Sequence, residues 1–366
     1  MLSGEWSVLE VGCPCIVMAV DRYCSASIEE NQKIILNAPD IGLINIEAEF
    51  DGTKLNWKKT LNQEEKTKIC VSEKAIEITL QYLIQKGKKI RNFIIETDSS
   101  QAIAKTGKGE KIGFGSSAAV SSAIVAALLK FHGIGIEEKK QKELIYKIAS
   151  TAHYLAQGKI GSAFDIASAT FGGVIVYKRF DPNWLISEIN SGKKLSEIMD
   201  CEWPAFSVEE LVLPNNFNLS VCYTGYSAST KELVLKLNSF KETQMEKYWK
   251  IINDIKEITQ QLIGAMEANE TEKIVALLNA NRKALQQLSL ESRNNFETKE
   301  LALISDIAQI FGAAGKFSGA GGGDCAIAVS FDQNTNKKIE QEWKKHGLEI
   351  VEIKISKAGV HSVELE

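Results

Sequence analysis

The sequence predicts an α+β protein of two lobes, and three observations support this fold class. The chain has 366 residues, more than the ~250–300 at which a single hydrophobic core usually stops growing. Along the chain, β-rich and helical regions follow one another as blocks: β, α, β, α and β again. Blocks of strands and blocks of helices, with no strict strand-by-strand alternation, are typical of α+β proteins. We expect one lobe over residues 1–180 and the other over 181–366.

Composition and charge exclude several classes of function. Hydrophobic residues make up 44% and charged residues 25% of the chain, as in an ordinary water-soluble protein. The net charge of −4 argues against a nucleic-acid or anionic-membrane partner. No segment approaches the ~20 apolar residues that span a bilayer, and no secretory signal is recognised. The seven cysteines are scattered without zinc spacing, so we expect reduced thiols in a cytoplasmic protein.

The first part of the chain is expected to form an antiparallel sheet with one helix. An apolar run over 15–20 predicts a buried strand, and the β-rich stretches 26–30, 33–37, 43–50 and 53–57 predict further strands. Asp51-Gly52, between the last two stretches, is typical of a hairpin turn. Apolar residues at helical spacing predict a helix over 72–86 that ends at Gly87, and a strand is expected at 90–96.

Helices are expected next at 117–131 and 137–155, then a loop with a short helix over 158–173 and a strand at 173–177. Residues 180–214 contain three of the five prolines, so this segment is expected to be irregular and to cross between the lobes. A strand is expected at 219–224, and helical segments from 231 to about 310 with breaks near 239, 269 and 292. Strands at 325–330 and 348–355 should flank a helix at 337–345, with a last strand at 360–364.

A glycine- and serine-rich stretch, KIGFGSSAAVSSA at 111–123, precedes a long apolar segment. Gly113 and Gly115 allow the backbone to bend tightly and to approach a ligand. Ser116 and Ser117 stand where a helix should begin, and a helix N-terminus is a ready phosphate site. Serine hydroxyls at such a site can also reach a magnesium ion. A tight turn capped by serine is the alternative interpretation of this first loop.

Two further loops carry candidate chemistry. The second, over 159–165, places Asp165 just inside an apolar helix, either as an ordinary first-turn aspartate or as a base or orienting charge in phosphoryl transfer. The third, over 318–324, holds four glycines in five positions, which predicts close packing against a ligand or against the first loop. Lys111, Lys159 and Lys316 border the three loops. Together they can attract ATP and an anionic acceptor, whereas each lysine alone is more often a solvated side chain than a phosphate ligand. His153, on an apolar helix, is expected to be a core histidine.

These three loops, in this order, resemble the GHMP kinase superfamily over essentially the whole chain. KIGFGSSAAVSSA is similar to its ATP phosphate loop, KFSGAGGGDCAIAV to its third motif, and GEWSVLEVGCPCIVMAVD to the end of its first motif. Within the superfamily the chain most resembles the phosphomevalonate kinases. QGKIGSAFDIASATFGG looks like their QGxxGSGxDxAxxxxGG stretch, and CYTGYSASTKELV like their WTGxPASTxxLV stretch. Glu297-Thr298 and Asp324 fit as well, because mevalonate kinases tend to have another glycine at the position of Asp324.

The resemblance implies a fold and a reaction. The fold is a two-lobed GHMP kinase fold, with an N-terminal lobe of ribosomal protein S5 domain 2-like topology and a C-terminal ferredoxin-like α/β lobe. The reaction is the phosphorylation of 5-phosphomevalonate to 5-diphosphomevalonate, with ATP and Mg²⁺ as cofactors. The implied partner is therefore a phosphorylated small molecule, with no nucleic acid and no membrane, and the protein is expected to be a monomer or a homodimer.

The resemblance also assigns residues to roles. Asp165 and Lys111 are the implied catalytic residues, and Ser117 is the implied magnesium ligand. The ATP phosphates are expected at Gly113, Gly115, Ser116, Ser117 and Ala118. The acceptor or the transferred phosphate is expected at Ser162, Ser229, Lys316, Ser318, Gly319, Ala320 and Gly321.

The chain departs from the family pattern at several positions. An APGK-like segment normally precedes the position of Met1, and its lysine is expected near the phosphates. Its absence indicates a start inside a longer chain, a truncated chain, or a relative that has lost activity. Phe317 and Ser227 stand where proline is usual, Ala163 where glycine is usual, and Trp6 where tyrosine is usual. The alternatives are thus another GHMP small-molecule kinase, acting on mevalonate or a sugar phosphate, or a nucleotide-binding protein without turnover.

Overall fold

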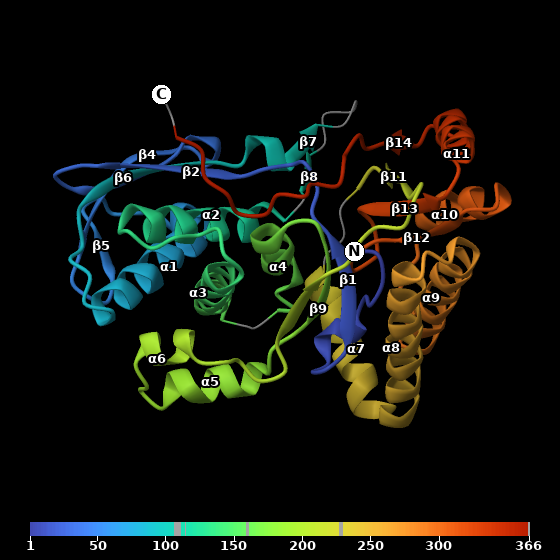
Figure 1. The fold of residues 1–366 in the computed structure, drawn as a ribbon, viewed down its shortest axis with the longest axis horizontal. Coiled ribbons are helices and arrows are strands. Elements are labelled where there is room, and N and C mark those ends of the chain that lie inside the picture. The colour runs from blue at the N-terminus through green and yellow to red at the C-terminus, as the bar shows by residue number, and fades with distance from the viewer. Residues whose placement is uncertain (106–110, 114, 159–160, 227–229, 365–366) are drawn as a thin grey trace.

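The structure is a computed structural model, and it describes residues 1–105, 111–113, 115–158, 161–226 and 230–364. Ser229 and Lys159, which the sequence associates with the site, lie outside the described residues. Figure 1 shows helices and sheets gathered into two lobes, with the N-terminal residues between them. The predicted α+β class is therefore confirmed. Among the described helices, none is both long enough and apolar enough to cross a membrane.

The N-terminal lobe is built on a five-stranded sheet with the strand order β2-β6-β3-β4-β5. Its inward residues alternate along the strands, as Ile34, Leu36 and Ala38 show. The helices α1 and α2 lie against one face of this sheet, and α3 packs beneath them (Figure 1). The bounds of these elements are β2 Ser25–Glu30, β3 Ile34–Ala38, β4 Leu43–Phe50, β5 Leu55–Trp57, β6 Phe93–Asp98, α1 Gln63–Gln85, α2 Ser116–Phe131 and α3 Lys139–Gln157.

A three-stranded antiparallel sheet lies beside this core, with β9 in the middle. β9 (Val174–Lys178) pairs with β1 (Pro14–Met18) on one side and with β10 (Ser207–Glu210) on the other. The short helix α4 (Phe164–Phe171) precedes β9 and packs on α2 and α3. A small hairpin of β7 (Ile103–Lys105) and β8 (Lys111–Gly113) leads into α2.

The segment 180–214 differs from the expectation. It forms α5 (Pro182–Asn190), α6 (Leu195–Asp200) and β10, and its residues Leu185, Met199 and Trp203 join the core of the N-terminal lobe. Pro182 does not indicate irregular structure, because it lies in the first turn of α5, directly after the capping residue Asp181, where proline is favourable. The predicted boundary at residue 180 therefore precedes three elements that pack with the first lobe.

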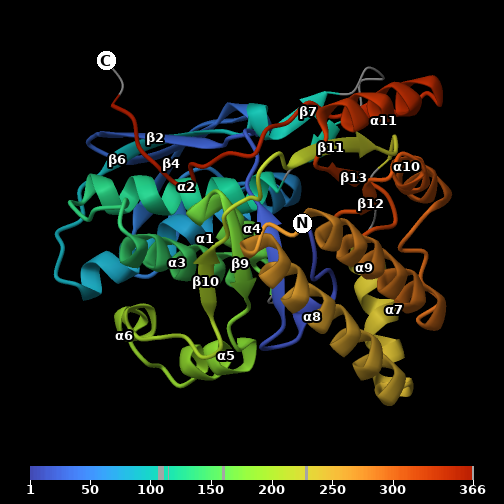
Figure 2. The same ribbon diagram turned by 45° about the vertical axis from the view of Figure 1, so that its right-hand side comes forward.

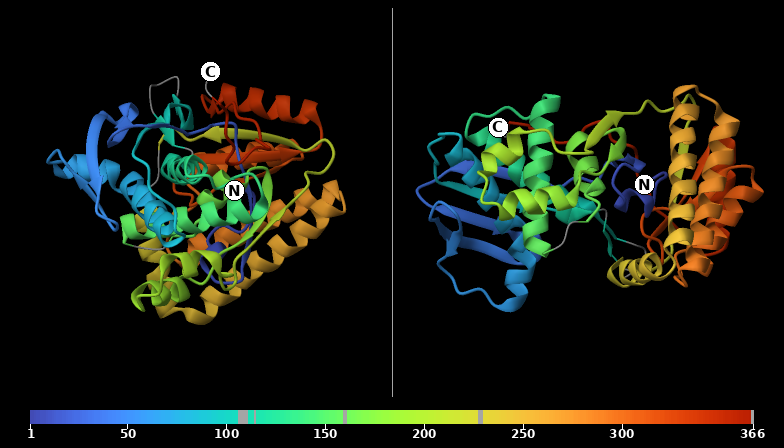
Figure 3. Two further views of the ribbon diagram at one scale, coloured as in Figure 1. Left: turned by 60° about the vertical axis from the view of Figure 1, so that its left-hand side comes forward. Right: turned by 90° about the horizontal axis from the view of Figure 1, so that it is seen from below.

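The C-terminal lobe has a four-stranded sheet with the order β12-β13-β11-β14. Its strands and helices follow one another in the βαββαβ pattern of ferredoxin-like folds, with several helices in the first connection. Figure 2 shows α8 and α9 as a long antiparallel pair, and in the view from below in Figure 3 this helical pair lies in front on the right, where α8 packs on β1. The bounds are β11 Asn218–Tyr223, α7 Thr230–Thr243, α8 Met245–Glu267, α9 Thr271–Glu291, α10 Lys299–Ile310, β12 Ala314–Phe317, β13 Cys325–Ser330, α11 Gln333–Lys345 and β14 Glu349–Ile350.

Several predicted boundaries are wrong. The helix α1 begins well before residue 72, because Asn62 and Glu65 form a capping box ahead of polar turns that carry no apolar periodicity. The break expected near 239 lies at Gln244. Of the strand expected over 348–355, only the two residues of β14 form a strand, and residues 360–364 form none. That last segment crosses instead onto the N-terminal lobe, where the Val360 N–H donates to the carbonyl of Thr170 at 3.0 Å.

Candidate active site

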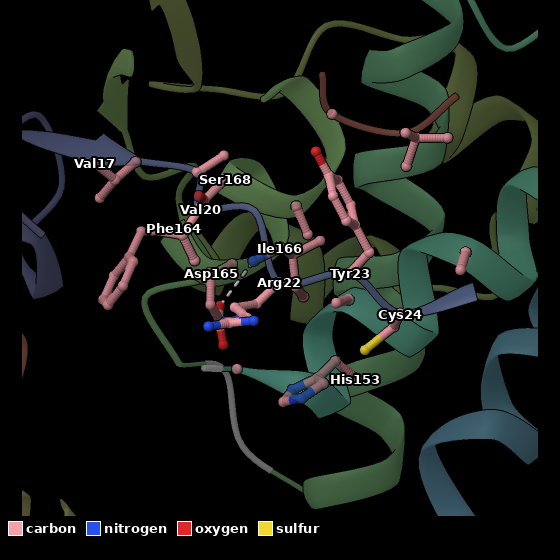
Figure 4. Close-up of a pocket in the computed structure, with 18 of the residues that line it drawn as sticks. Val17, Val20, Arg22, Tyr23, Cys24, His153, Phe164, Asp165, Ile166 and Ser168 are labelled. Carbon is pink, nitrogen blue, oxygen red and sulfur yellow. Dashed lines mark hydrogen bonds between the residues drawn. The ribbon is translucent and has the colours of Figure 1, made fainter. Parts of the chain in front are cut away.

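A cleft of about 1810 Å³ opens between the two lobes. The walls from the N-terminal lobe come from β1, β2, α2, α3 and α4, and those from the C-terminal lobe from β11, β13 and the third loop. Figure 4 shows Asp165, Arg22 and His153 among the residues that line this space, with the Arg22 side chain beside Asp165 in the view. Six of the predicted site residues line the cleft: Gly115, Ser162, Asp165, Ser318, Gly319 and Ala320.

The first loop ends in the helix N-terminus that the sequence predicted. Gly115 is the residue before α2 and has a φ of 72°, which requires the left-handed conformation that glycine adopts easily. The cap residue Gly115 has no side chain to accept hydrogen bonds, so among the described residues the early N–H groups of α2 lack a side-chain cap and can bind a ligand. Ser116 and the exposed Ser117 form this turn, whereas Ala118 is buried and packs into the core. Lys111 and Gly113 are described only through the backbone of β8.

The second loop brings Asp165 to the first loop. Ala163 takes the left-handed conformation, with a φ of 57°, and α4 begins immediately after it. Asp165 lies in the first turn of α4, half-buried, and its Oδ1 accepts the N–H of Ile166 at 2.9 Å. A Cβ atom added to Gly115 would lie 3.8 Å from the Cβ of Asp165. The carboxylate and the α2 N-terminus are thus neighbours, although they are about fifty residues apart in the chain.

The third loop is held by hydrogen bonds to the first residue of β13 and to Met1. The N–H of Ser318 donates to the carbonyl of Cys325 at 3.0 Å, and the Ser318 hydroxyl donates to the carbonyl of Met1 at 2.9 Å. Gly321 has a φ of +73°, and a Cβ there would lie 2.4 Å from the carbonyl oxygen of Phe296. The close approach that the glycines allow is therefore to Phe296, and Ser318, Gly319 and Ala320 remain facing the cleft.

Known proteins are similar to this chain in sequence. The family profiles "GHMP kinases N terminal domain" and "GHMP kinases C terminal" match residues 73–173 and 263–348. A phosphomevalonate kinase of Saccharolobus solfataricus is 31% identical over 249 residues, which cover 67% of this chain and 68% of that protein. The chain belongs to the GHMP kinase family. A phosphomevalonate kinase of Streptomyces sp. is 26% identical over 95% of this chain and 92% of its own length.

One solved structure shows the same fold over nearly the whole of this GHMP kinase. It is the Streptococcus pneumoniae phosphomevalonate kinase in complex with phosphomevalonate and AMPPNP. Its TM-score is 0.80 at 22% identity, and the alignment covers 97% of this chain and 96% of the other. At this identity the likeness establishes the fold.

Lys316 is placed differently from the expectation for an acceptor contact. Its side chain is 1% exposed and forms an ion pair with Glu5, which is equally buried. Its Nζ also donates to the carbonyl of Phe317 at 2.7 Å. Burial lowers the pKa of Lys316, and the negative charge of Glu5 opposes that shift. The charge of Lys316 is therefore held inside the protein and is not presented to the cleft.

Two cleft residues were missed by the sequence interpretation. His153, expected in the core, is half-buried on α3 and lines the cleft, with its Nε2 3.4 Å from the Ser117 hydroxyl. Arg22 follows β1 and lines the cleft (Figure 4), and its Nη2 donates to the carbonyl of Glu352 at 2.6 Å. The only signal for Arg22 in the sequence was its place two residues after the predicted buried strand 15–20. His153 gave none, because its helix carries apolar neighbours on both sides.

Proposed function

We propose that this GHMP kinase transfers the terminal phosphoryl group of ATP to 5-phosphomevalonate, giving 5-diphosphomevalonate and ADP. The observation that carries the proposal is the convergence on one cleft of the α2 N-terminus, Asp165 and the third loop. The relatives named phosphomevalonate kinase, at 26% and 31% identity, support the choice of acceptor. The seven free cysteines fit a reducing compartment, so we place the reaction in the cytoplasm.

ATP fits the first loop. Uncapped N–H groups and the positive end of the α2 dipole favour the phosphates, and the left-handed Gly115 lets the backbone approach them. The described residues include no cluster of three His, Cys, Asp or Glu side chains that could hold a metal ion. This suits Mg²⁺, which binds through one or two protein oxygens and the substrate phosphates. We propose Ser117 as that protein ligand. Bound Mg²⁺ supplies charge neutralisation on the phosphates.

The proposed reaction needs alignment more than proton transfer. An oxygen of the acceptor phosphate forms a bond to the γ-phosphorus of ATP, while the bond from that phosphorus to the β,γ-bridging oxygen breaks. ADP leaves with the electron pair. Because the acceptor phosphate is largely ionised near neutral pH, Asp165 acts mainly by placing charge and by accepting the proton of any monoanion. Arg22 lines the same cleft and offers positive charge to the transferred group.

The proposal is tested by an ADP-release assay with ATP and Mg²⁺. Mevalonate, 5-phosphomevalonate and several sugar phosphates serve as acceptors for the full chain. Turnover with 5-phosphomevalonate, at a kcat/KM at least ~100-fold above the others, supports the proposal. A preference for mevalonate or a sugar phosphate would mean that the protein is a kinase with a different acceptor from the one proposed. ATP binding without turnover on any acceptor indicates a nucleotide-binding protein and contradicts the proposed reaction.

A further inference from the structure

Two fully buried tyrosines form a hydrogen-bonded chain that ends at the second loop. Tyr146 on α3 and Tyr177 on β9 are both 0% exposed. Their hydroxyl oxygens are 2.7 Å apart, and the Tyr177 hydroxyl donates to the carbonyl of Ser162 at 2.7 Å. Ser162 lines the cleft three residues before Asp165. The two hydrogen bonds therefore connect the interior of the N-terminal lobe to the turn that carries Asp165.

The donor and the acceptor in each of these hydrogen bonds follow from the number of protons available. A tyrosine hydroxyl has one proton, and Tyr177 gives its proton to the Ser162 carbonyl. Tyr146 must therefore donate to the oxygen of Tyr177. Burial raises the pKa of both tyrosines above its ordinary value, so the donors keep their protons throughout the pH range of an enzyme assay.

The two tyrosine rings are held in fixed positions by their neighbours. β9 is the middle strand of its sheet, and Tyr177 is in register with Cys15 on β1 and with Val208 on β10. The ring of Tyr146 stacks on Phe206 with centroids 4.6 Å apart and an interplanar angle of 9°. Both rings thus have fixed positions, and the Tyr177 hydroxyl is a fixed point inside the lobe.

The turn at the other end needs such support. Ala163, directly after Ser162, is a residue with a Cβ in the left-handed conformation, a strained geometry that persists only where the surrounding structure holds it. α4 begins at the next residue and carries Asp165 in its first turn. A shift of the Ser162 carbonyl would therefore rotate or displace the first turn of α4, and with it the carboxylate beside Gly115.

We infer that Tyr177, itself held by Tyr146, is a positioning residue that fixes the Ser162–Asp165 turn for phosphoryl transfer. The inference rests on the proposed function, because it assigns the turn to the same reaction. Neither tyrosine lines the cleft, so each acts through the backbone and touches no substrate.

The test compares Tyr177→Phe and Tyr146→Phe with Tyr82→Phe as a matched control. Tyr82 is also a buried tyrosine of the N-terminal lobe, but its hydroxyl donates to Asp200 at 2.9 Å, and neither residue lines the cleft. We expect Tyr177→Phe to lower kcat about 10-fold with the KM for ATP unchanged, since misplacement of a catalytic group lowers the rate without removing nucleotide contacts. Tyr146→Phe should lower kcat less, and the double variant no more than Tyr177→Phe alone. Tyr82→Phe should leave both constants unchanged.

Hydrogen exchange of the free protein gives a second readout that needs no substrate. Loss of one buried hydrogen bond, about 1 kcal/mol, should speed exchange in peptides covering 161–168 about 5-fold in Tyr177→Phe and not in Tyr82→Phe. If the wild-type chain has no turnover on 5-phosphomevalonate, the proposed function is refuted. Hydrogen exchange at 161–168, compared between Tyr177→Phe and Tyr82→Phe, then still tests whether Tyr177 holds the turn. Unchanged exchange at 161–168, or a kcat of Tyr177→Phe equal to that of Tyr82→Phe, overturns the inference. If Tyr177→Phe does not fold, Tyr146→Phe takes its place with the same criteria and a smaller expected change.

Discussion

Removal of the Lys316 charge tests whether this lysine stabilises the fold or binds the acceptor. The substitution Lys316→Met keeps much of the side-chain volume and leaves the Glu5 carboxylate buried without its counter-charge. Glu5 is 1% exposed, and its Oε2 has no hydrogen-bond partner among the described residues even with Lys316 present. Breaking a buried ion pair on one side costs about 3–5 kcal/mol. We therefore expect a large loss of stability from Lys316→Met.

The expected change in Tm follows from the length of the chain. For 366 residues that unfold as one unit, 1 kcal/mol corresponds to about 1.3 °C, so Lys316→Met should lower Tm by about 4–7 °C. The double variant Glu5→Gln/Lys316→Met should recover at least half of this loss, because the Glu5 carboxylate is then no longer buried without Lys316. Lys236→Met is the control: its ion pair with Glu232 is exposed, and its loss should cost less than about 1 kcal/mol.

Thermal unfolding followed by calorimetry measures these shifts, and acceptor KM is measured on the same samples. The structural account is refuted if Lys316→Met keeps the wild-type Tm while its KM for the acceptor rises more than about 10-fold. That outcome would return Lys316 to the role of an acceptor contact that the sequence predicted. A double variant no more stable than Lys316→Met would separately contradict the ion-pair reasoning.

Three further predictions concern other parts of the molecule. Asp165→Ala should lower turnover by at least ~100-fold while ATP still binds in calorimetric titration, and near-normal turnover would remove Asp165 from the mechanism. Gly321→Ala should lower the free energy of unfolding by about 3 kcal/mol, because its Cβ meets the Phe296 carbonyl at 2.4 Å, and Gly319→Ala, which has open space, by about 1 kcal/mol; equal losses in denaturant titrations would contradict this. Burial lowers the pKa of His132, so below pH 6.5 the unfolded chain binds more protons and stability falls with falling pH. His132→Gln should flatten that fall between pH 7 and pH 5, and an unchanged slope would exclude His132 as its source.

Local sequence predicted the first and second loops because their signals are short-range. Gly115 and the two serines after it mark a helix N-terminus within a few residues, and the structure places α2 there. Asp165 was expected in a first helical turn and lies in one. The α+β class followed in the same way, since strand and helix periodicities are visible in windows of about ten residues.

The partners of buried charges could not be predicted from local sequence. Lys316 and Glu5 are 311 positions apart, and only the packing of β12 against the N-terminal residues brings them together. His153 is a similar case, because its exposure to the cleft depends on how α3 packs against α2. The prediction for residues 180–214 was wrong for a local reason. The prolines suggested loops, but Pro182 lies in the first turn of α5, where a helix tolerates proline.

Analysis of the reaction product by ³¹P NMR and mass spectrometry tests the central claim most directly. The full chain is incubated with ATP, Mg²⁺ and 5-phosphomevalonate, and ADP is measured alongside. The proposal predicts two coupled phosphorus signals of a diphosphate ester, formed in equal amount with ADP. Formation of ADP with inorganic phosphate and unchanged 5-phosphomevalonate, or phosphorylation at a hydroxyl of the acceptor, would contradict it.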